Sequence, residues 1–311
     1  MKRNISDLSV FVAIVLALAA FFISGWMAAS GKGSLLTSGL PAMLMILACC
    51  VPLYFIHQWI LPGASIVTAL FYAFLAPANP VSFCLSPFHV VALLSSVTLY
   101  CYLCFTALRP ALKYAAGLWI TFGFAVQLLP SLLWMAPVLL LSSIGKAPEK
   151  GKYCFITLLG LTLPPIAWMA IRYLVNGALP FSGYFPVFWT ETSTLHLPST
   201  NLPIVTLCRI GFTVLLTVMA FLHILPKLSR FSIVQFRAVL RLLLLAICLT
   251  IYAFLFLDYP ARPVGLLVML PVAPLLSIFM LYPFLRKDAG YWLFILLLLL
   301  AVERISLFVN L

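Results

Sequence analysis

Long apolar stretches recur along the chain and are separated by short polar connections. Most stretches are continuous over about 17 to 25 residues, the length that lets an α-helix cross the hydrocarbon of a bilayer. Strands of a transmembrane barrel would instead alternate apolar and polar positions over about ten residues. We therefore predict an all-α, polytopic transmembrane helix bundle of about eleven spans. The predicted spans cover residues 8–29, 38–56, 59–76, 87–106, 113–127, 130–144, 153–175, 202–224, 236–257, 263–283 and 291–309.

Two parts of this prediction leave alternatives open. The fifth and sixth spans are short and interrupted by Pro130 and Pro137, so they form either one broken helix or a tight pair. The first span is either a retained helix or a cleaved signal peptide, because Lys2 and Arg3 precede it and small residues follow it. Its length, together with Trp26 near the potential cleavage site, favours a retained helix.

Residues 1–311 are predicted to form a single integral membrane domain, and the longest polar connection is 176–201. Its prolines and glycines are helix breakers, so a long helix is not expected there. Its aromatic residues are too apolar for free solvent: Phe181, Tyr184, Phe185, Phe188 and Trp189. We expect an outer loop that lies in the membrane interface, or a short re-entrant element.

The basic residues predict the sidedness, because Lys and Arg accumulate in short cytoplasmic loops. With a cytoplasmic N-terminus, the alternating loops place every basic cluster inside. The inside set is Lys2, Arg3, Arg109, Lys113, Lys146, Lys150, Lys152, Lys227, Arg230, Arg237, Arg241, Arg286 and Lys287. The outside set is Lys32, Arg172, Arg209, Arg262 and Arg304. This bias supports the span count and predicts a C-terminus outside the cytoplasm.

Composition agrees with a lipid environment. Apolar residues make up 65% of the 311, charged residues 8%, and the mean hydropathy is +1.20. Soluble domains carry about a quarter of their residues as charged side chains, so a water-soluble fold is excluded. The net charge of +12 does not indicate nucleic-acid binding, because the basic residues are scattered between apolar runs and not gathered on one face. The expected partners are the lipid bilayer and other membrane proteins.

Cysteine and histidine give no metal or cofactor prediction. The eight cysteines fall mostly within apolar spans, where cysteine packs as a small hydrophobic residue. The four histidines form no metal-binding spacing. His57 and His223 are expected at cytoplasmic helix ends with their polar tips in the interface, and His196 shares the outer loop with Glu191, with which it could transfer a proton.

Ionisable residues at membrane depth are costly and are the best indicators of function. Arg172 and Arg209 flank the long outer loop, and Glu303 with Arg304 lies in the last span. One interpretation brings Arg172, Arg209, Glu191 and Glu303 together as an outer-facing substrate site, where the arginines bind a phosphate or carboxylate head group. In the other, the arginines extend to lipid phosphates and serve no substrate.

One segment of about a fifth of the chain resembles a known group of proteins. It combines Pro130, Trp134 and Pro137, the basic turn at 146–152, and the run from Leu158 through Gly160 to Pro165. This combination resembles an uncharacterised family of multi-spanning inner-membrane proteins of Gram-negative bacteria. The resemblance implies a location in the bacterial cytoplasmic (inner) membrane and carries no catalytic residue.

Three functions remain open. The sequence holds no recognisable catalytic constellation, which favours a non-enzymatic scaffold or an accessory subunit of an envelope process. Prolines inside the spans and the Arg172/Arg209 pair suggest a transporter or lipid-handling permease. The many-span topology is also shared by polyprenyl-dependent glycosyltransferases and polysaccharide polymerases. These carry an acid in the first outer loop, whereas 30–37 has none here and Glu191 is the main outer acid.

Overall fold

A computed structural model describes residues 39–61, 65–77, 80–108, 110–176, 204–224, 231–257 and 263–281, with a few positions between 295 and 302. Within these residues the regular structure is helical and no strand occurs. The first predicted span, most of the outer connection 176–201 and nearly all of the last span lie outside them. The elements are α2 (Leu40–Trp59), α3 (Ser65–Leu75), η2 (Pro80–Phe83), α4 (Pro87–Leu103), η3 (Cys104–Leu108), α5 (Leu112–Leu128), η4 (Pro130–Met135), α6 (Ala136–Ile144), α7 (Lys150–Asn176), α9 (Ile204–Ile224), α10 (Ile233–Phe256) and α11 (Gly265–Leu281).

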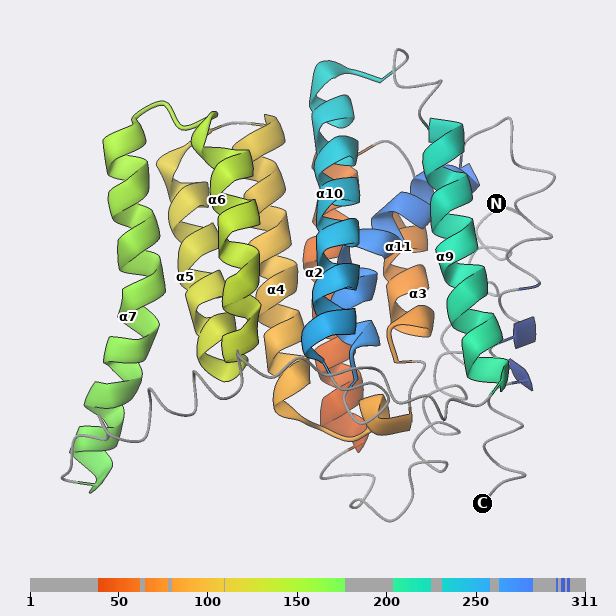
Figure 1. The fold of residues 1–311 in the computed structure, drawn as a ribbon, viewed down its shortest axis with the longest axis horizontal. Coiled ribbons are helices and arrows are strands. Elements are labelled where there is room, and N and C mark those ends of the chain that lie inside the picture. The colour runs from red at the N-terminus through yellow and green to blue at the C-terminus, as the bar shows by residue number, and fades with distance from the viewer. Residues whose placement is uncertain are drawn as a thin grey trace, which may run out of the picture.

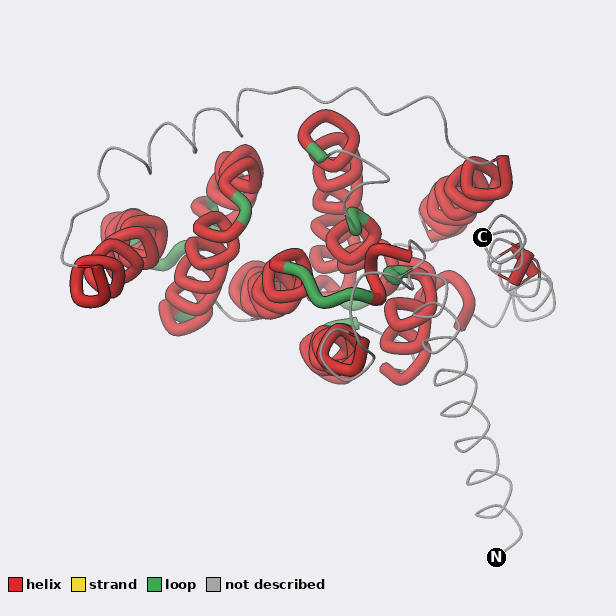
Figure 2. The backbone as a smooth tube through the Cα atoms, turned by 90° about the horizontal axis from the view of Figure 1, so that it is seen from below, coloured by secondary structure: helices red, strands yellow, loops and turns green. Residues whose placement is uncertain are grey.

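The helices lie side by side along a common direction, and the chain reverses from each long helix to the next (Figure 1). Seen along that direction, they form an elongated group with α7 at one end and α9 at the other (Figure 2). Helix α11 is central, because it packs against α2, α3, α4, α9 and α10. It is apolar all round, as expected of a helix that is buried on every side.

Most helices coincide with the predicted spans to within a few residues, with two informative differences. The third predicted span begins at residue 59, but Trp59 is the last residue of α2 and α3 starts only at Ser65. The fifth and sixth spans are separate elements: α5 ends at Leu128, Leu129 takes a non-helical conformation, and the 3₁₀ turn at Pro130 starts the return through α6 (Figure 1). The tight-pair alternative is therefore the one observed.

Four of the described helices are long and apolar enough to cross a membrane: Leu40–Trp59, Pro87–Leu108, Lys150–Val175 and Ile233–Ala253. Helix α10 illustrates why lipid suits them. Its inward positions, such as Leu242 and Leu245, are buried, yet its outward positions Leu240, Ile247 and Ile251 are also large and apolar. A helix with an apolar core face and an apolar exposed face fits a bilayer and not water.

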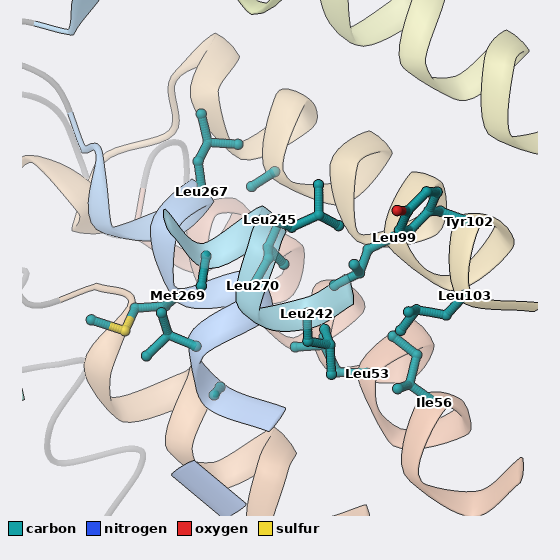
Figure 3. Packing of buried hydrophobic residues seen from close by; sticks show 14 of the residues in the cluster. Leu53, Ile56, Leu99, Tyr102, Leu103, Leu242, Leu245, Leu267, Met269 and Leu270 are labelled. Carbon is teal, nitrogen blue, oxygen red and sulfur yellow. The ribbon is translucent and has the colours of Figure 1, made fainter. Parts of the chain in front are cut away.

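The core joins helices that are distant in sequence. Leu53 and Ile56 of α2 and Leu99 and Leu103 of α4 lie near Leu242 of α10 (Figure 3). The same cluster continues through α11 and into α5 and α7. Burial of these side chains fixes the helix positions that hold the polar groups described below.

Helix α7 is attached to the bundle mainly through α5, at a very close contact. A Cβ atom on Gly160 would lie 2.5 Å from Cβ of Trp119, and one on Gly123 would overlap the carbonyl oxygen of Gly160. Small residues let two helix backbones approach in this way in membranes. The indole of Trp119 donates a hydrogen bond of 3.0 Å to the hydroxyl of Tyr153, and this buried hydroxyl also contacts Ser143 of α6.

Most basic residues of the described helices gather at one end of the bundle, whereas Arg172 of α7 and Arg209 of α9 lie toward the other end. Helices α5, α7 and α10 all begin at the end drawn at the top of Figure 1. We call this the basic end, because these helix starts and the turn before α7 carry Lys113, Lys146, Lys150, Lys152, Arg237 and Arg241. The Glu149–Lys152 ion pair of 2.6 Å lies on the exposed turn there.

Candidate functional site: two interhelical polar clusters

The four residues predicted to form an outer site are not assembled by the described structure. Arg172 lies in the last turns of α7 and Arg209 near the start of α9, and only their backbones are described. These two helices stand at opposite ends of the helix group (Figures 1 and 2). The expectation that the two arginines face one cavity therefore gains no support. Glu191 and Glu303 lie outside the described residues.

A buried hydroxyl–imidazole cluster joins α2, α3 and α11. The hydroxyl of Thr68 donates to Oγ of Ser277 at 2.7 Å, and Ser277 in turn donates to the carbonyl of Pro274 at 2.8 Å. Nε2 of His57 lies 2.8 Å from the same Oγ. A serine hydroxyl has one donor and two acceptor positions. Thr68, Pro274 and His57 together occupy these three positions of Ser277.

His57 was expected in the interface with its polar tip exposed, and that expectation is wrong. Its side chain is 2% exposed, and Thr68 and Ser277 are fully buried. The last turn of α2 points His57 into the bundle, where Ser277 is the one hydroxyl residue of an otherwise apolar helix α11. In hydrocarbon a polar side chain needs such a partner, so the cluster ties three helices together.

His89 has a local structural role at the start of α4. The backbone N–H of Ser86 donates to Nδ1 of His89 at 3.2 Å, and Nε2 lies 2.9 Å from the carbonyl oxygen of Ser82. An N–H group can only donate and a carbonyl can only accept, so the proton is on Nε2. His89 therefore satisfies backbone groups at the helix N-terminus, in the position that Glu or Gln takes in a usual capping box.

The second cluster lies at the basic end, between α4, η3, α6 and α10. Nη1 of Arg241 donates to the carbonyl of Thr106 at 2.9 Å, and Tyr102 lies close enough to interact with the guanidinium. Tyr102 donates to Oγ of Ser142 at 2.7 Å, and Ser142 donates to the carbonyl of Val138 at 2.5 Å. The cation of α10 is thus bound to η3 and lies beside a hydroxyl pair that joins α4 to α6.

The backbone at η3 explains why Thr106 can accept from Arg241. Residues Cys104–Leu108 form a π-helical turn at the end of α4. Such turns widen the helix and change the pairing of its carbonyl groups, and they occur often at functional sites. Thr106 lies in the last turn of this helix, and Pro110, four residues further on, has no N–H to donate, so the carbonyl of Thr106 is left for the arginine.

Cysteine residues add no further centre. All eight are free thiols, including Cys101 and Cys104 of the Cys-Tyr-Leu-Cys segment, which are buried. Within the described part of the chain, no group of three His, Cys, Asp or Glu side chains is placed to hold a metal ion.

The sequence did not reveal the two clusters. Arg241 was assigned only to the cytoplasmic set of basic residues, and Ser277 and Thr68 are ordinary residues in apolar spans. The two residues of the Arg241–Thr106 contact are 135 positions apart in the sequence, and those of the Thr68–Ser277 contact are 209 positions apart. The one available signal was an arginine placed about five residues inside the predicted span 236–257.

Comparison with known proteins gives no further identification: no family model, no curated protein sequence and no solved structure matches the chain. The resemblance of the 117–176 region to inner-membrane proteins stays a prediction.

Proposed function

We propose that the chain is a multi-pass protein of the bacterial cytoplasmic membrane, with eleven spans, a cytoplasmic N-terminus and an external C-terminus. The observation that supports this topology is the gathering of Lys113, Lys146, Lys150, Lys152 and Arg237 at one end of the described helices. Helices that alternate in direction bring every second loop to the same end, and cytoplasmic loops are the basic ones.

Cysteine labelling in intact cells tests this topology. In a chain whose native cysteines are replaced, Lys146→Cys reports on the basic end and Leu85→Cys, in the loop before α4, reports on the other end. Both positions are exposed. An impermeant maleimide should label Leu85→Cys in intact cells and Lys146→Cys only after permeabilisation. Labelling of Lys146→Cys from outside would contradict the orientation.

Within this membrane frame we propose a non-enzymatic role, as a scaffold or accessory subunit of an envelope process. The supporting observation is how the buried polar side chains are used. Thr68, Ser277, Tyr102, Ser131 and Tyr252 all take part in hydrogen bonds between different helices. These bonds tie α3 to α11, α4 to α6 and η4 to α10, which suits a protein that holds partners in place.

Purification of the full chain from native membranes tests the scaffold. A scaffold should retain a membrane partner in fixed stoichiometry through mild detergent and size-exclusion chromatography. In cells that lack the chain, the same partner should be found outside its complex. The proposal is contradicted if the chain purifies without a partner and its deletion leaves all envelope complexes intact.

A transporter is the second candidate, and one observation favours it. The buried His57–Ser277–Thr68 cluster lies within the spans, beside a helix that contains Pro271 and Pro274. Ionisable groups and interrupted helices at membrane depth are features of transport pathways. Reconstituted chain should then support a flux that Ser277→Ala reduces, while Ser232→Ala, on the exposed cap of α10, leaves it unchanged. Flux unaffected by Ser277→Ala would contradict this candidate.

A further inference from the structure

Arg237 and Arg241 place two positive charges on one side of α10 at the basic end. They are four residues apart, so both project from the same face of the helix. Arg237 is exposed and Arg241 is half-buried against η3, and the charge of Arg237 is close enough to act on Arg241. Two like charges held this close at a membrane boundary are stabilised by an anion between or above them.

The guanidinium of Arg241 is held in a fixed orientation. Its bond to the Thr106 carbonyl uses one of its five N–H donors, and Tyr102 lies beside the guanidinium. Tyr102 is itself held by Ser142, at 2.7 Å. The remaining donors therefore belong to a planar group whose position is set before a ligand arrives, which lowers the entropy cost of binding.

No carboxylate of the described chain neutralises this pair. Glu149 is the single acidic residue among the described positions, and its carboxylate is paired with Lys152 at 2.6 Å. A further charge at this end is also positive, because Lys113 lies in the first turn of α5, which also packs on η3. The site thus has an excess of donors and positive charge without a described counter-charge.

The predicted span places the pair within reach of the phosphate layer of a bilayer. Arg241 lies five residues beyond the start of the predicted span at 236, or about 7.5 Å along the helix. Side chains on a helix lean toward its N-terminus, so an arginine at this depth extends back to the interface. Arginine also matches phosphate oxygens with two parallel N–H donors.

We infer that Arg237 and Arg241, oriented by Tyr102 and the carbonyl of Thr106, bind the phosphate of an anionic lipid head group at the basic end of the bundle. The recognition chemistry is a phosphate monoanion held by two guanidinium groups. It would also fit a free phosphate compound, so the experiment separates the two sources. The inference does not depend on the scaffold or the transport proposal.

The test measures stabilisation of the purified full chain by added ligand. The thermal unfolding midpoint is recorded in detergent with phosphatidylglycerol, with phosphatidylcholine and with inorganic phosphate, each over a concentration series. Phosphatidylglycerol should raise the midpoint at the lowest concentration. Removal of each arginine, by Arg237→Gln or Arg241→Gln, should weaken the apparent lipid affinity about tenfold, since a charge-assisted hydrogen bond to phosphate contributes at least about that factor. Native mass spectrometry should show the matching loss of retained phosphatidylglycerol.

Lys146→Gln is the matched control, because it removes one exposed positive charge from the same end without touching η3 or Tyr102. Its lipid response should equal that of the wild-type chain. Arg237→Gln keeps the test decisive if Arg241→Gln does not fold, since Arg237 is exposed. Equal responses of Arg237→Gln and Lys146→Gln would overturn the site. Stabilisation by inorganic phosphate at the same concentration as phosphatidylglycerol would overturn its assignment to a lipid.

Discussion

The close contact of α5 with α7 leads to a sharp prediction for Gly160→Ala. The new Cβ would lie 2.5 Å from Cβ and 2.7 Å from the carbonyl carbon of Trp119, whereas ordinary contacts begin near 3.4 Å. The helices must therefore separate locally by about 0.9 Å. A separation of this size removes a quarter to a half of the dispersion energy at the contact and loosens the Trp119–Tyr153 hydrogen bond.

Two opposing terms set the expected change in the free energy of unfolding. Overpacking, with the shifts that it forces, lowers this free energy by about 3 kcal/mol at the upper end of its usual range. The higher helix propensity of alanine raises it by about 1 kcal/mol. The net loss is about 2 kcal/mol, which lowers the midpoint of thermal unfolding by about 3 °C for a chain of this size.

Gly151→Ala is the control in the same helix, because nothing lies within 4 Å of its Cβ position. It should leave the midpoint unchanged or raise it slightly. Both variants are compared with the wild-type chain in detergent, with tryptophan fluorescence as a reporter of the environment of Trp119. The reasoning is refuted if Gly160→Ala unfolds at the same temperature as Gly151→Ala.

Three further substitutions test the polar contacts. Ser277→Ala should lower stability by about 1–2 kcal/mol, because it removes the buried hydrogen bond to Nε2 of His57; an unchanged chemical-denaturation midpoint would argue against the cluster. Tyr153→Phe keeps the ring and loses the hydrogen bond from Trp119, so stability should fall by about 1 kcal/mol. In a double-mutant cycle with Trp119→Phe, the stability losses of the two single variants should not be additive. Ser232→Ala removes the cap of α10 and should cost about 1 kcal/mol, seen as faster amide exchange in the first turn of that helix; exchange equal to that of the wild-type chain would contradict it.

Helix positions could be predicted from the sequence where polar residues flank an apolar run on both sides. The predicted span 153–175 lies within α7, Lys150–Asn176, because basic residues precede it and Asn-Gly follows. Prediction failed between α2 and α3, where the polar pair His57-Gln58 was taken as the boundary between two spans. This pair lies within α2, which continues to Trp59, so Trp59 was assigned to the wrong helix.

The candidate site could be predicted much less well. Arg172 and Arg209 were grouped because the chain brings them to the same long loop, yet sequence proximity across a connection does not place two helices side by side. The contact of Arg241 with Thr106 depends on a π-helical turn and on the packing of α10 against η3. Neither leaves a periodic pattern in the sequence.

The central place of α11 has a consequence for how the protein is made. Helices α2 and α3 leave the ribosome about 200 residues before α11, and the hydroxyl of Ser277 reaches Thr68 and His57 only after α11 has been inserted. Until then the early helices must keep an imidazole and a hydroxyl in contact with the translocon, with each other or with interfacial water. A nascent chain that stops before residue 263 would expose these groups to lipid, and membrane proteases should remove it faster than the completed chain.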